Sequence, residues 1–499
     1  MAAWTEQSRI RVMTRVFREE DAAVTVSVLV MGTAMILLFL AIFNFGKYLM
    51  AIRQSETALE ASAASVLSHY EKELVREMGL FALDTKTEKL EDLGAAYFTD
   101  NLGASDSLNG QKLTRYTLIF NEEARLGQDG VLLSQALDMQ RIGGWGAVAR
   151  DLLEILDLGD WDKNLSASLG KGREEAESGL DETQSSREEA PELLEMMEEM
   201  APGTQGRAKF WQFLLPWPPS GAIADRVMPA AVLQEAYEGK SSAAVDVQAG
   251  FWENTFLAPA SALREEGFMR EVLGQTEGFL SGIAAGLSSA LRKGRDKLLF
   301  TEYLLSELDF ATNKPVMNRY FTRCETEFVL FGHKRSWDNV RHAVLQMFLM
   351  RVCLHISGSV LSMEVVNQAA LTKAVIEGIV HGSKDIERLL AGERIAVIPG
   401  NTAAASLSAL TMSYKDHLRL FLLCQNEGEQ QKALRRIVQT NLWYWAGEKN
   451  AEDFALDRYG AEIRASAETE ISLWPFGTIR IRREGVMGYD KPFTLLSQE

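Results

Sequence analysis

The chain has 499 residues, a formal net charge of −17 at pH 7 and three cysteines. Its excess of acidic side chains argues against a nucleic acid or a polyanionic lipid surface as the partner of the main body. Three cysteines are too few for a disulfide framework and lack the spacing of metal ligands. We therefore interpret Cys324, Cys353 and Cys424 as small buried side chains, with one disulfide among them left open.

The first predicted element is an apolar stretch, residues 22–46, which contains no charged residue and no histidine. A helix of this length spans about 37 Å, more than the roughly 30 Å hydrocarbon core of a bilayer. Thirteen of its residues are Val, Leu, Ile or Phe, and on the insertion scale they contribute together on the order of −4 to −8 kcal/mol. A buried core helix normally carries some charge on one face, and a cleavable signal has a shorter apolar run. We predict a retained transmembrane helix.

The flanking charges predict the orientation of this helix. Four arginines precede the span, whereas the twenty residues after it offer only Lys47 and Arg53 as cations. The positive-inside rule then makes residues 1–21 a cytoplasmic tail and places residue 47 onward outside the cell. The predicted localisation is the cell membrane, with lipid as one partner. We disfavour a ligand sensor because such a tail is too short for an output domain.

Residues 47–79 predict an amphipathic helix that continues from the span, because neither Gly nor Pro occurs before Gly79. Its apolar side chains recur at three- and four-residue steps. They are Leu59, Ala63, Leu67, Tyr70, Leu74 and Met78. A continuous rod, half in lipid and half packed against an exterior domain, is the general plan of pilin-like proteins. A plain anchor with a short stalk explains the same pattern.

Residues 68–84, SHYEKELVREMGLFALD, follow this single span and resemble the opening of the DUF5702 family of Firmicutes. The likeness continues in LLFTEY (298–303), ETEFVLFG (325–332) and YKDHLRL (414–420), and it covers most of the chain in order. Members are uncharacterised membrane proteins that resemble the TadE and TadG components of tight-adherence (Tad) pilus systems. The resemblance implies a non-enzymatic component or accessory of a Tad-like, type IV pilus-related pilus or secretion assembly, with other membrane or pilus-assembly proteins as partners.

One feature departs from processed pilins, which resemble one another in a Gly before the cleavage point and a Glu at the fifth position of the mature helix. No acidic residue follows Asp21 within the apolar run of this chain. We therefore expect the span to be retained rather than processed.

The exterior part begins with residues 80–171, the first part of the ectodomain. We predict a helix over 86–102, a half-buried strand over 112–120, and a helical segment over 130–156 that is interrupted at Gly143-Gly144. Residues 172–220 form an acidic and Pro/Trp-rich loop. It contains an acidic run over 173–200, interpreted as solvated rather than cation-binding, and an aromatic and proline cluster over 210–219, interpreted as docked on the core.

Residues 221–499 are predicted to form the main ectodomain, which is largely helical. The expected helices lie over 279–308 with a break near Gly294, 337–356, 363–380, 384–390, a segment capped by Ser413 and Asp416, and 430–445. A C-terminal β-hairpin pairs 470–474 with 478–483, with Ile479 and Ile481 inward and Arg480 and Arg482 outward. The predicted fold class is α+β: a transmembrane helix, a long pilin-like helix, and a mainly helical ectodomain with a few antiparallel strands.

Arg351 lies in an apolar setting within the helix predicted over 337–356. Burying an unpaired guanidinium is prohibitive, so it needs a partner. We predict a structural ion pair with Glu325 or Glu327, on a candidate strand that precedes the helix. Two acids on one face could also act as an acid and a base, but no nucleophile, histidine or metal cluster lies near them in sequence.

The search for catalytic motifs gives no candidate. The six histidines lack the i, i+4 spacing of a helical zinc site, and HExxH, Walker A, GxSxG and the full Rossmann fingerprint do not occur. Residues 144–149 match a looser GxGxxA pattern, but helix rather than strand is predicted before them. Ser413, Asp416 and His417 lie close in sequence, yet helical neighbours point about 100° apart. We predict no catalytic, cofactor or metal residue and no small-molecule substrate. The alternative is an extracytoplasmic enzyme, such as a cell-wall hydrolase, whose site is built from distant residues.

Overall fold

The computed structural model of the chain describes eleven stretches, and its contacts divide the chain into two compact units. The described residues are 2–86, 89–103, 110–128, 130–142, 226–228, 266–313, 318–362, 368–397, 411–447, 455–475 and 477–496. The sheet unit comprises Met1–Tyr70, Leu83–Ala124 and Gly460–Glu499, and the helical unit comprises Glu71–Ala82 and Arg125–Tyr459. The fold mixes helices with a few antiparallel strands and carries an apolar helix near its N-terminus. The predictions for residues 143–156, 173–200 and 210–219 lie outside the described residues.

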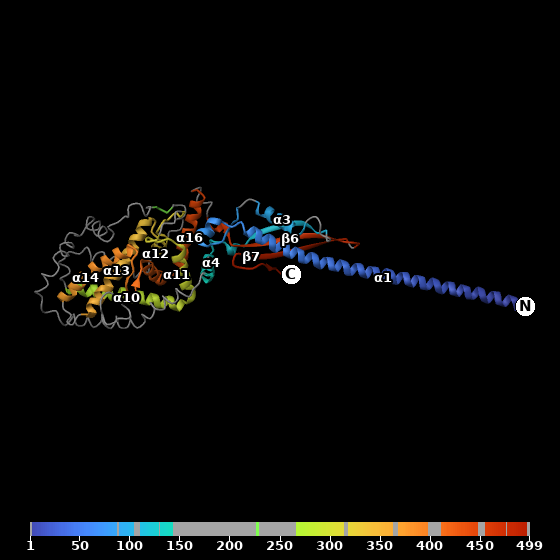
Figure 1. Cartoon of the computed structure of the whole chain (residues 1–499), viewed down its shortest axis with the longest axis horizontal. Coiled ribbons are helices and arrows are strands. Elements are labelled where there is room, and N and C mark those ends of the chain that lie inside the picture. The colour runs from blue at the N-terminus through green and yellow to red at the C-terminus, as the bar shows by residue number, and fades with distance from the viewer. Residues whose placement is uncertain are drawn as a thin grey trace. The chain divides into compact units, whose positions relative to one another are not determined.

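The sheet unit combines one long helix with an antiparallel sheet (Figure 1). Its helices are α1 (Ala2–Leu67) and α3 (Leu90–Asn101), with a 3-10 turn η1 (Glu122–Ala124). The four-stranded sheet has the order β2-β6-β7-β8. Its strands are β2 (Lys112–Phe120), β6 (Glu462–Leu473), β7 (Gly477–Gly488) and β8 (Thr494–Leu495), and a short β1 (Leu83–Asp84) lies outside it.

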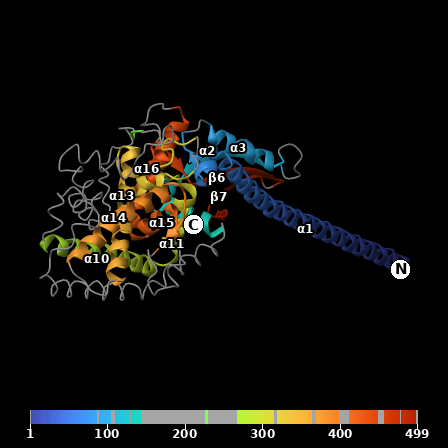
Figure 2. The same ribbon diagram turned by 60° about the vertical axis from the view of Figure 1, so that its left-hand side comes forward.

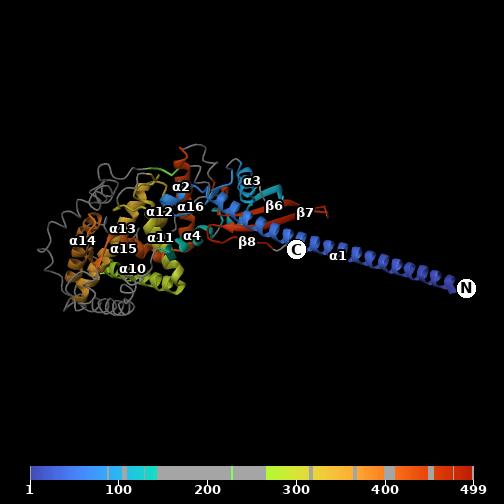
Figure 3. The same ribbon diagram turned by 45° about the vertical axis from the view of Figure 1, so that its right-hand side comes forward.

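The second half of α1 packs on this sheet (Figure 3). Ala58 and Ala63 on the helix and Ala465 and Ala467 on β6 are all buried in one cluster. Small side chains on both sides let the helix axis approach the sheet closely. The Tyr489 hydroxyl, which follows β7, donates a hydrogen bond of 2.7 Å to the carbonyl of Leu67 at the end of α1. The apolar side chains on this face of the sheet are thereby buried against the helix of the same unit.

The helical unit holds the larger core, and its α13 is buried along most of its length (Figure 2). Its first helices are α2 (Lys72–Met78), α4 (Val131–Ile142), α10 (Glu266–Lys293), α11 (Arg295–Glu307) and α12 (Glu325–Phe331). The later elements are α13 (Ser336–Ser362), α14 (Gln368–Leu390), β3 (Ile395–Ala396), β4 (Thr411–Met412), α15 (Tyr414–Cys424), α16 (Glu427–Trp445) and η5 (Leu456–Arg458). The division between the units falls within β5 (Tyr459–Gly460).

Several local predictions are confirmed. Ser413 and Asp416 form a complete capping box at the start of α15, and Gly294 separates α10 from α11 with a φ of 82°. The strand over 112–120 is β2, and the C-terminal hairpin is β6 and β7, longer at both outer ends than expected. All three cysteines are free, so the disulfide left open by the sequence does not form.

The continuous helix expected from residue 47 to residue 79 is wrong, because α1 ends at Leu67 and a separate α2 begins at Lys72. The polar side chains that follow α1 bind its last carbonyls. The Ser68 hydroxyl donates to Ser65 O at 2.6 Å, and His69 Nδ1 lies 3.0 Å from the same oxygen. Side chains that satisfy these acceptors replace the next turn of backbone hydrogen bonds.

Two other elements also differ from the sequence prediction. Residues 325–331 form the helix α12 rather than a strand, and Gly332 ends it in the left-handed region at φ 65°. Residues 368–390 form one helix, α14, rather than two, because Gly382 serves close packing against α13 instead of breaking the helix. The hairpin, placed with the main ectodomain by the sequence, groups with α1 in the sheet unit. Within it Ile481 is buried as predicted, but Ile479, nearer the tip, is 40% exposed.

Candidate functional site

The apolar segment of α1, residues 24–45, is exposed along its length. Its most apolar window has no buried residue. Its exposed large side chains are Val24, Val26, Val28, Leu29, Val30, Met31, Met35, Ile36, Leu37, Leu38, Phe39, Ile42, Phe43 and Phe45. Soluble monomers rarely expose apolar patches of this extent, and such patches mark interaction sites. The segment is long and apolar enough to cross a membrane, which makes it the first candidate functional surface of the chain.

Asn44 is the exception within this segment, because it is only 5% exposed. Its Nδ2 donates to Leu40 O and to Trp474 O, both at 2.8 Å. One turn further, Lys47 Nζ donates to Ser472 O at 3.2 Å. The tip of the β6–β7 hairpin is therefore tied to α1 where the apolar segment ends. The sequence gives no local signal for this contact, because the Trp474 carbonyl lies 430 residues away from Asn44.

Arg351 on α13 is 1% exposed and is paired, but not with the predicted acids. Its Nε donates to Asp385 Oδ2 at 2.7 Å, and its Nη1 donates to Val397 O at 2.9 Å. His355 Nε2 lies 2.9 Å from the same Asp385 oxygen. Asp385 belongs to α14, which packs directly on α13. The predicted pair with Glu325 or Glu327 is wrong, because those residues lie on α12 and have other partners.

The protonation of this cluster follows from its contacts. Burial alone would raise the pKa of Asp385, but the hydrogen bond from His355 and the charge of Arg351 outweigh it and hold the pKa below its usual value. Burial lowers the pKa of His355. His355 is then neutral near pH 7, and because the ionised Asp385 can only accept, Nε2 carries the hydrogen. The cluster neutralises one buried guanidinium between two packed helices.

Glu325 is buried and takes its partners from three segments of the helical unit. Its Oε2 accepts from Arg319 Nη1 at 2.6 Å and from the Asp309 backbone N at 3.2 Å. Its Oε1 accepts from Asn441 Nδ2 at 2.8 Å. Arg319 also donates to the backbone carbonyls of Glu307 and Glu77. Glu325 is thus in a structural ion pair, as expected for one of these acids, but its partner is Arg319.

Glu327 is fully buried without a cationic partner. Its Oε1 accepts from the Ala311 backbone N and from the Tyr414 hydroxyl, both at 2.8 Å, while its Oε2 has no partner. Burial raises the pKa of Glu327 to about 7, against the opposing effect of these two hydrogen bonds. Glu327 is therefore poised between its neutral and ionised forms near neutral pH, which the sequence did not indicate.

Asp385 was missed by sequence reasoning, although the sequence contains a signal for it. Gly378, Gly382 and Asp385 follow one another at steps of four and three residues, so they share one face of α14. A Cβ on Gly378 would come within 2.9 Å of Ile356 Cγ1, and one on Gly382 within 2.8 Å of Val352 Cγ2. This face is therefore the one that meets α13, and an acid on it is the natural partner for an arginine on α13.

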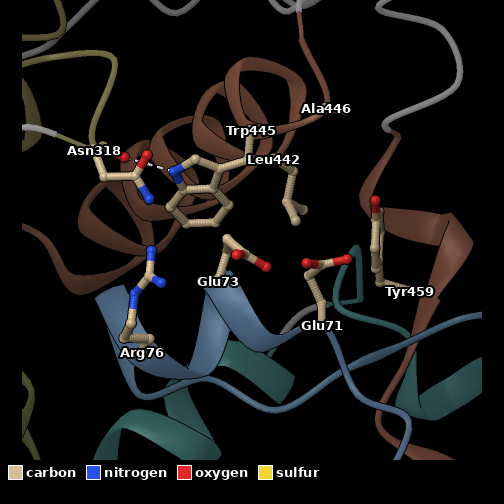
Figure 4. A pocket seen from close by; sticks show the side chains of 8 residues that line it. All are labelled: Glu71, Glu73, Arg76, Asn318, Leu442, Trp445, Ala446 and Tyr459. Atoms are coloured by element: carbon tan, nitrogen blue, oxygen red, sulfur yellow. Dashed lines mark hydrogen bonds between the residues drawn. The ribbon is translucent and has the colours of Figure 1, made fainter.

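A pocket of about 430 Å³ in the helical unit brings two further acids together (Figure 4). The carboxylates of Glu71 and Glu73 point into it, between the rings of Trp445 and Tyr459 (Figure 4). Trp445 is fixed by its Nε1, which donates to Asn318 O at 2.6 Å. Carboxylates beside aromatic faces suit a small cation. The pocket holds no buried side chain that lacks a hydrogen-bond partner, so we assign it no ligand.

Neither metal chemistry nor a relative identifies the chain. Among the described residues, no group of three or more His, Cys, Asp or Glu side chains could hold a metal ion. Comparisons of the sequence and structure with protein-family models, with curated proteins and with solved structures find no match.

Proposed function

We propose that this chain is a non-enzymatic single-pass membrane protein, anchored by the apolar segment of α1, that presents the residues from Lys47 onward outside the cytoplasm. The observation that carries the proposal is the contrast within α1 itself. Its second half is buried against the sheet of its own unit, whereas the apolar segment has no buried residue in its most apolar window. At about 1.5 Å per residue, residues 24–45 span about 33 Å, which matches the hydrocarbon core of a bilayer.

The orientation rests on the flanking charges. Four arginines precede the segment, and Lys47 and Arg53 follow it. This bias favours a cytoplasmic N-terminus and an extracellular body. A large acidic body on the outer side is also compatible with a membrane whose lipids are anionic, because like charges keep the body off the lipid surface.

We further propose that the protein is a component or accessory of a Tad-like pilus or secretion assembly. A single helix with one half in lipid and the other packed against an exterior domain is the general plan of pilin-like proteins, and α1 is apolar in one part and packed on the sheet in another. The resemblance of residues 68–84 to the DUF5702 family supports the same assignment. Pilus-assembly proteins that contact the apolar segment within the bilayer are the expected partners.

A non-enzymatic role is supported by the contacts of the buried acids, because each of them is engaged in an ion pair or a hydrogen bond within the fold. Glu325 pairs with Arg319, Asp385 pairs with Arg351, and Glu327 accepts from Tyr414. Each of these contacts joins different elements of the helical unit. The alternative, an extracytoplasmic enzyme, has no support in the described residues.

Fractionation and surface labelling of cells test the anchor and its orientation. The full-length protein should stay with the membrane after alkaline carbonate washing. A cysteine introduced as Leu495→Cys, at an exposed position of β8, should react with a membrane-impermeant maleimide on intact cells. The matched variant Ser8→Cys, in the N-terminal tail, should react only after lysis. Recovery of the protein in the soluble fraction, or labelling of position 8 on intact cells, would refute the proposal.

Site-directed cross-linking tests the assembly. A photo-reactive amino acid at Phe39, 65% exposed on the apolar segment, should give a covalent product with a Tad-type pilin or platform protein. The same group at Thr494, on the exposed strand β8, serves as the control. Cross-linking to lipid alone, together with unchanged piliation after deletion of the gene, would leave the anchor in place and remove the pilus assignment.

A further inference from the structure

The β6–β7 hairpin ends at the level where the apolar segment of α1 ends. The strands close at the pair Leu473 and Gly477. Next to this closure, Trp474 is joined through its carbonyl to Asn44, and Ser472 is joined to Lys47. Asn44 lies two residues before Gly46, which closes the uncharged run, and this corresponds to about 3 Å along the helix.

The side chain at this tip points to solvent. Trp474 is 73% exposed, the largest value among the exposed large apolar side chains. Ile479, on the returning strand, and Phe45, on α1, are also exposed. These side chains extend the apolar surface of α1 sideways onto the hairpin. Next to them on the same two strands, Ile471, Leu473 and Ile481 are buried in a cluster with α1.

A cationic side chain, Arg480, follows behind the tip and is paired across the hairpin with Glu470. Arg480 is exposed and lies three residues beyond Gly477, which is about 10 Å along the strand. The order from tip to body is therefore an exposed tryptophan followed by an exposed arginine. This order matches the layers of a bilayer surface, where tryptophan prefers the boundary between hydrocarbon and headgroups and arginine reaches the phosphates.

We propose that the tip of the β6–β7 hairpin is a second membrane contact, in which Trp474 inserts into the outer interfacial layer beside α1. This inference rests on the proposed function, because it needs α1 to cross the bilayer. A single helix leaves a protein free to tilt and rotate about its axis. A second contact, bonded to the helix through Asn44 and Lys47, fixes both the depth of the span and the direction in which the sheet unit leaves the membrane.

Depth-dependent fluorescence quenching tests the inference on the full chain in phosphatidylcholine vesicles that contain phosphatidylglycerol. Single reporters are introduced as Ile36→Cys in the middle of the apolar segment, Trp474→Cys at the tip, and Leu495→Cys on β8. Each carries a polarity-sensitive fluorophore. The natural cysteines interfere little, because burial raises the pKa of Cys353 and of Cys424 to about 12 and that of Cys324 well above its usual value. The unsubstituted chain is the labelling blank.

The three positions separate the two proposals. We expect lipids spin-labelled near the headgroup to quench position 474 strongly and to shift its emission to the blue. Lipids labelled at mid-chain should quench position 36, and neither lipid should quench position 495. Quenching at position 36 with position 474 behaving like position 495 overturns the hairpin contact and leaves the anchor standing. No quenching at position 36 overturns both.

A second measurement keeps the native side chain. Brominated lipids quench tryptophan, and the difference in quenching between the wild type and Trp474→Phe reports on Trp474 alone. Because Trp474 is exposed, the substitution should not disturb the fold. A measurable loss of bromine quenching in Trp474→Phe supports insertion, and identical quenching of the two proteins contradicts it.

Discussion

Two helices of this chain are long and apolar enough to cross a membrane, and they are used in opposite ways. The apolar segment of α1 has no buried residue in its most apolar window, whereas 89% of the residues are buried in the most apolar window of α13, within Ser336–Val360. α13 contacts α10, α12 and α14, and its buried Arg351 is neutralised by Asp385. Length and composition therefore do not separate an anchor from a core helix. The difference lies in the neighbouring helices, which bury most of α13 and supply a partner for its buried arginine.

The largest expected effect comes from placing acids in each helix in turn. Ile36→Asp together with Leu37→Asp should cost about 6 to 8 kcal/mol of insertion free energy, since each replaces a favourable residue by an aspartate near the helix centre. The variant should leave the carbonate-resistant membrane fraction while the helical unit keeps its resistance to protease. Met347→Asp on α13 changes a fully buried position. This variant should stay in the carbonate-resistant membrane fraction, while its helical unit becomes sensitive to protease. A membrane-bound Ile36→Asp/Leu37→Asp protein would contradict the distinction between the two helices.

The next largest effect is the loss of stability expected when the buried charge of Arg351 on α13 is removed. Arg351→Met leaves Asp385 as an unpaired buried anion, so we expect a loss of about 3 to 5 kcal/mol in the free energy of unfolding. Urea denaturation of the detergent-solubilised protein, followed by tryptophan fluorescence, measures it. Arg351→Met with Asp385→Leu should recover most of the loss, because no charge then remains buried.

The control for this pair is Arg388→Met. Arg388 lies on α14 and also pairs with an acid, Glu393, but both of these side chains are about half exposed. Surface pairs of this kind contribute little to stability, because water screens both charges. An Arg351→Met protein that is no less stable than Arg388→Met would show that the buried pair is dispensable.

Features that depend on local sequence patterns were predicted correctly, whereas contacts between distant residues were not. The apolar segment, the capping box at Ser413 and the strand over 112–120 depend on local patterns, and the structure contains each of them. The need of Arg351 for a partner also followed from its own burial. The identity of that partner did not, since it depends on which helix lies against α13. Two helices, 363–380 and 384–390, were predicted where the structure has the single helix α14.

Contacts between distant parts of the sequence account for the remaining differences. The alternation of Glu325 and Glu327 with apolar residues suggested a strand, but both acids are buried in a seven-residue helix because partners from other elements bind them. The bond from Asn44 to the hairpin joins residues 430 positions apart. No local pattern contains that information, which is why the sequence did not indicate that the hairpin bonds to the end of the apolar segment.

A pH-dependent effect of about 3 kcal/mol should arise from Glu327, next to α13 in the helical unit. Burial raises its pKa from 4.5 to about 7, and a tenfold change in proton affinity corresponds to about 1.36 kcal/mol. The folded state then binds more protons than the unfolded state between these two pH values. The resulting stabilisation is complete below about pH 4.5 and is lost as the pH rises through about 7.

Urea denaturation of wild type and Glu327→Gln between pH 4.5 and pH 8 measures this contribution. The neutral amide cannot ionise, so the variant should gain stability relative to wild type as the pH rises. Glu393→Gln, on the surface of the helical unit, is the control: its free energy of unfolding should vary with pH as that of wild type does. Parallel pH profiles for wild type and Glu327→Gln would show that Glu327 is not held near neutrality.

The smallest expected effect tests the close packing of α14 on α13. It compares a substitution at Gly382 on α14 with one at Gly32 on α1. Gly382→Leu places a side chain where a Cβ already comes within 2.8 Å of Val352, so overpacking should cost about 1 to 3 kcal/mol of unfolding free energy. Gly32→Leu on the apolar segment of α1 meets nothing within 4 Å and should leave the urea midpoint unchanged. The two substitutions are chemically identical, so a difference between their midpoints reports only on what surrounds each helix. Equal midpoints would mean that α14 can move away from α13 without loss, and burial would then no longer distinguish the core helix from the anchor.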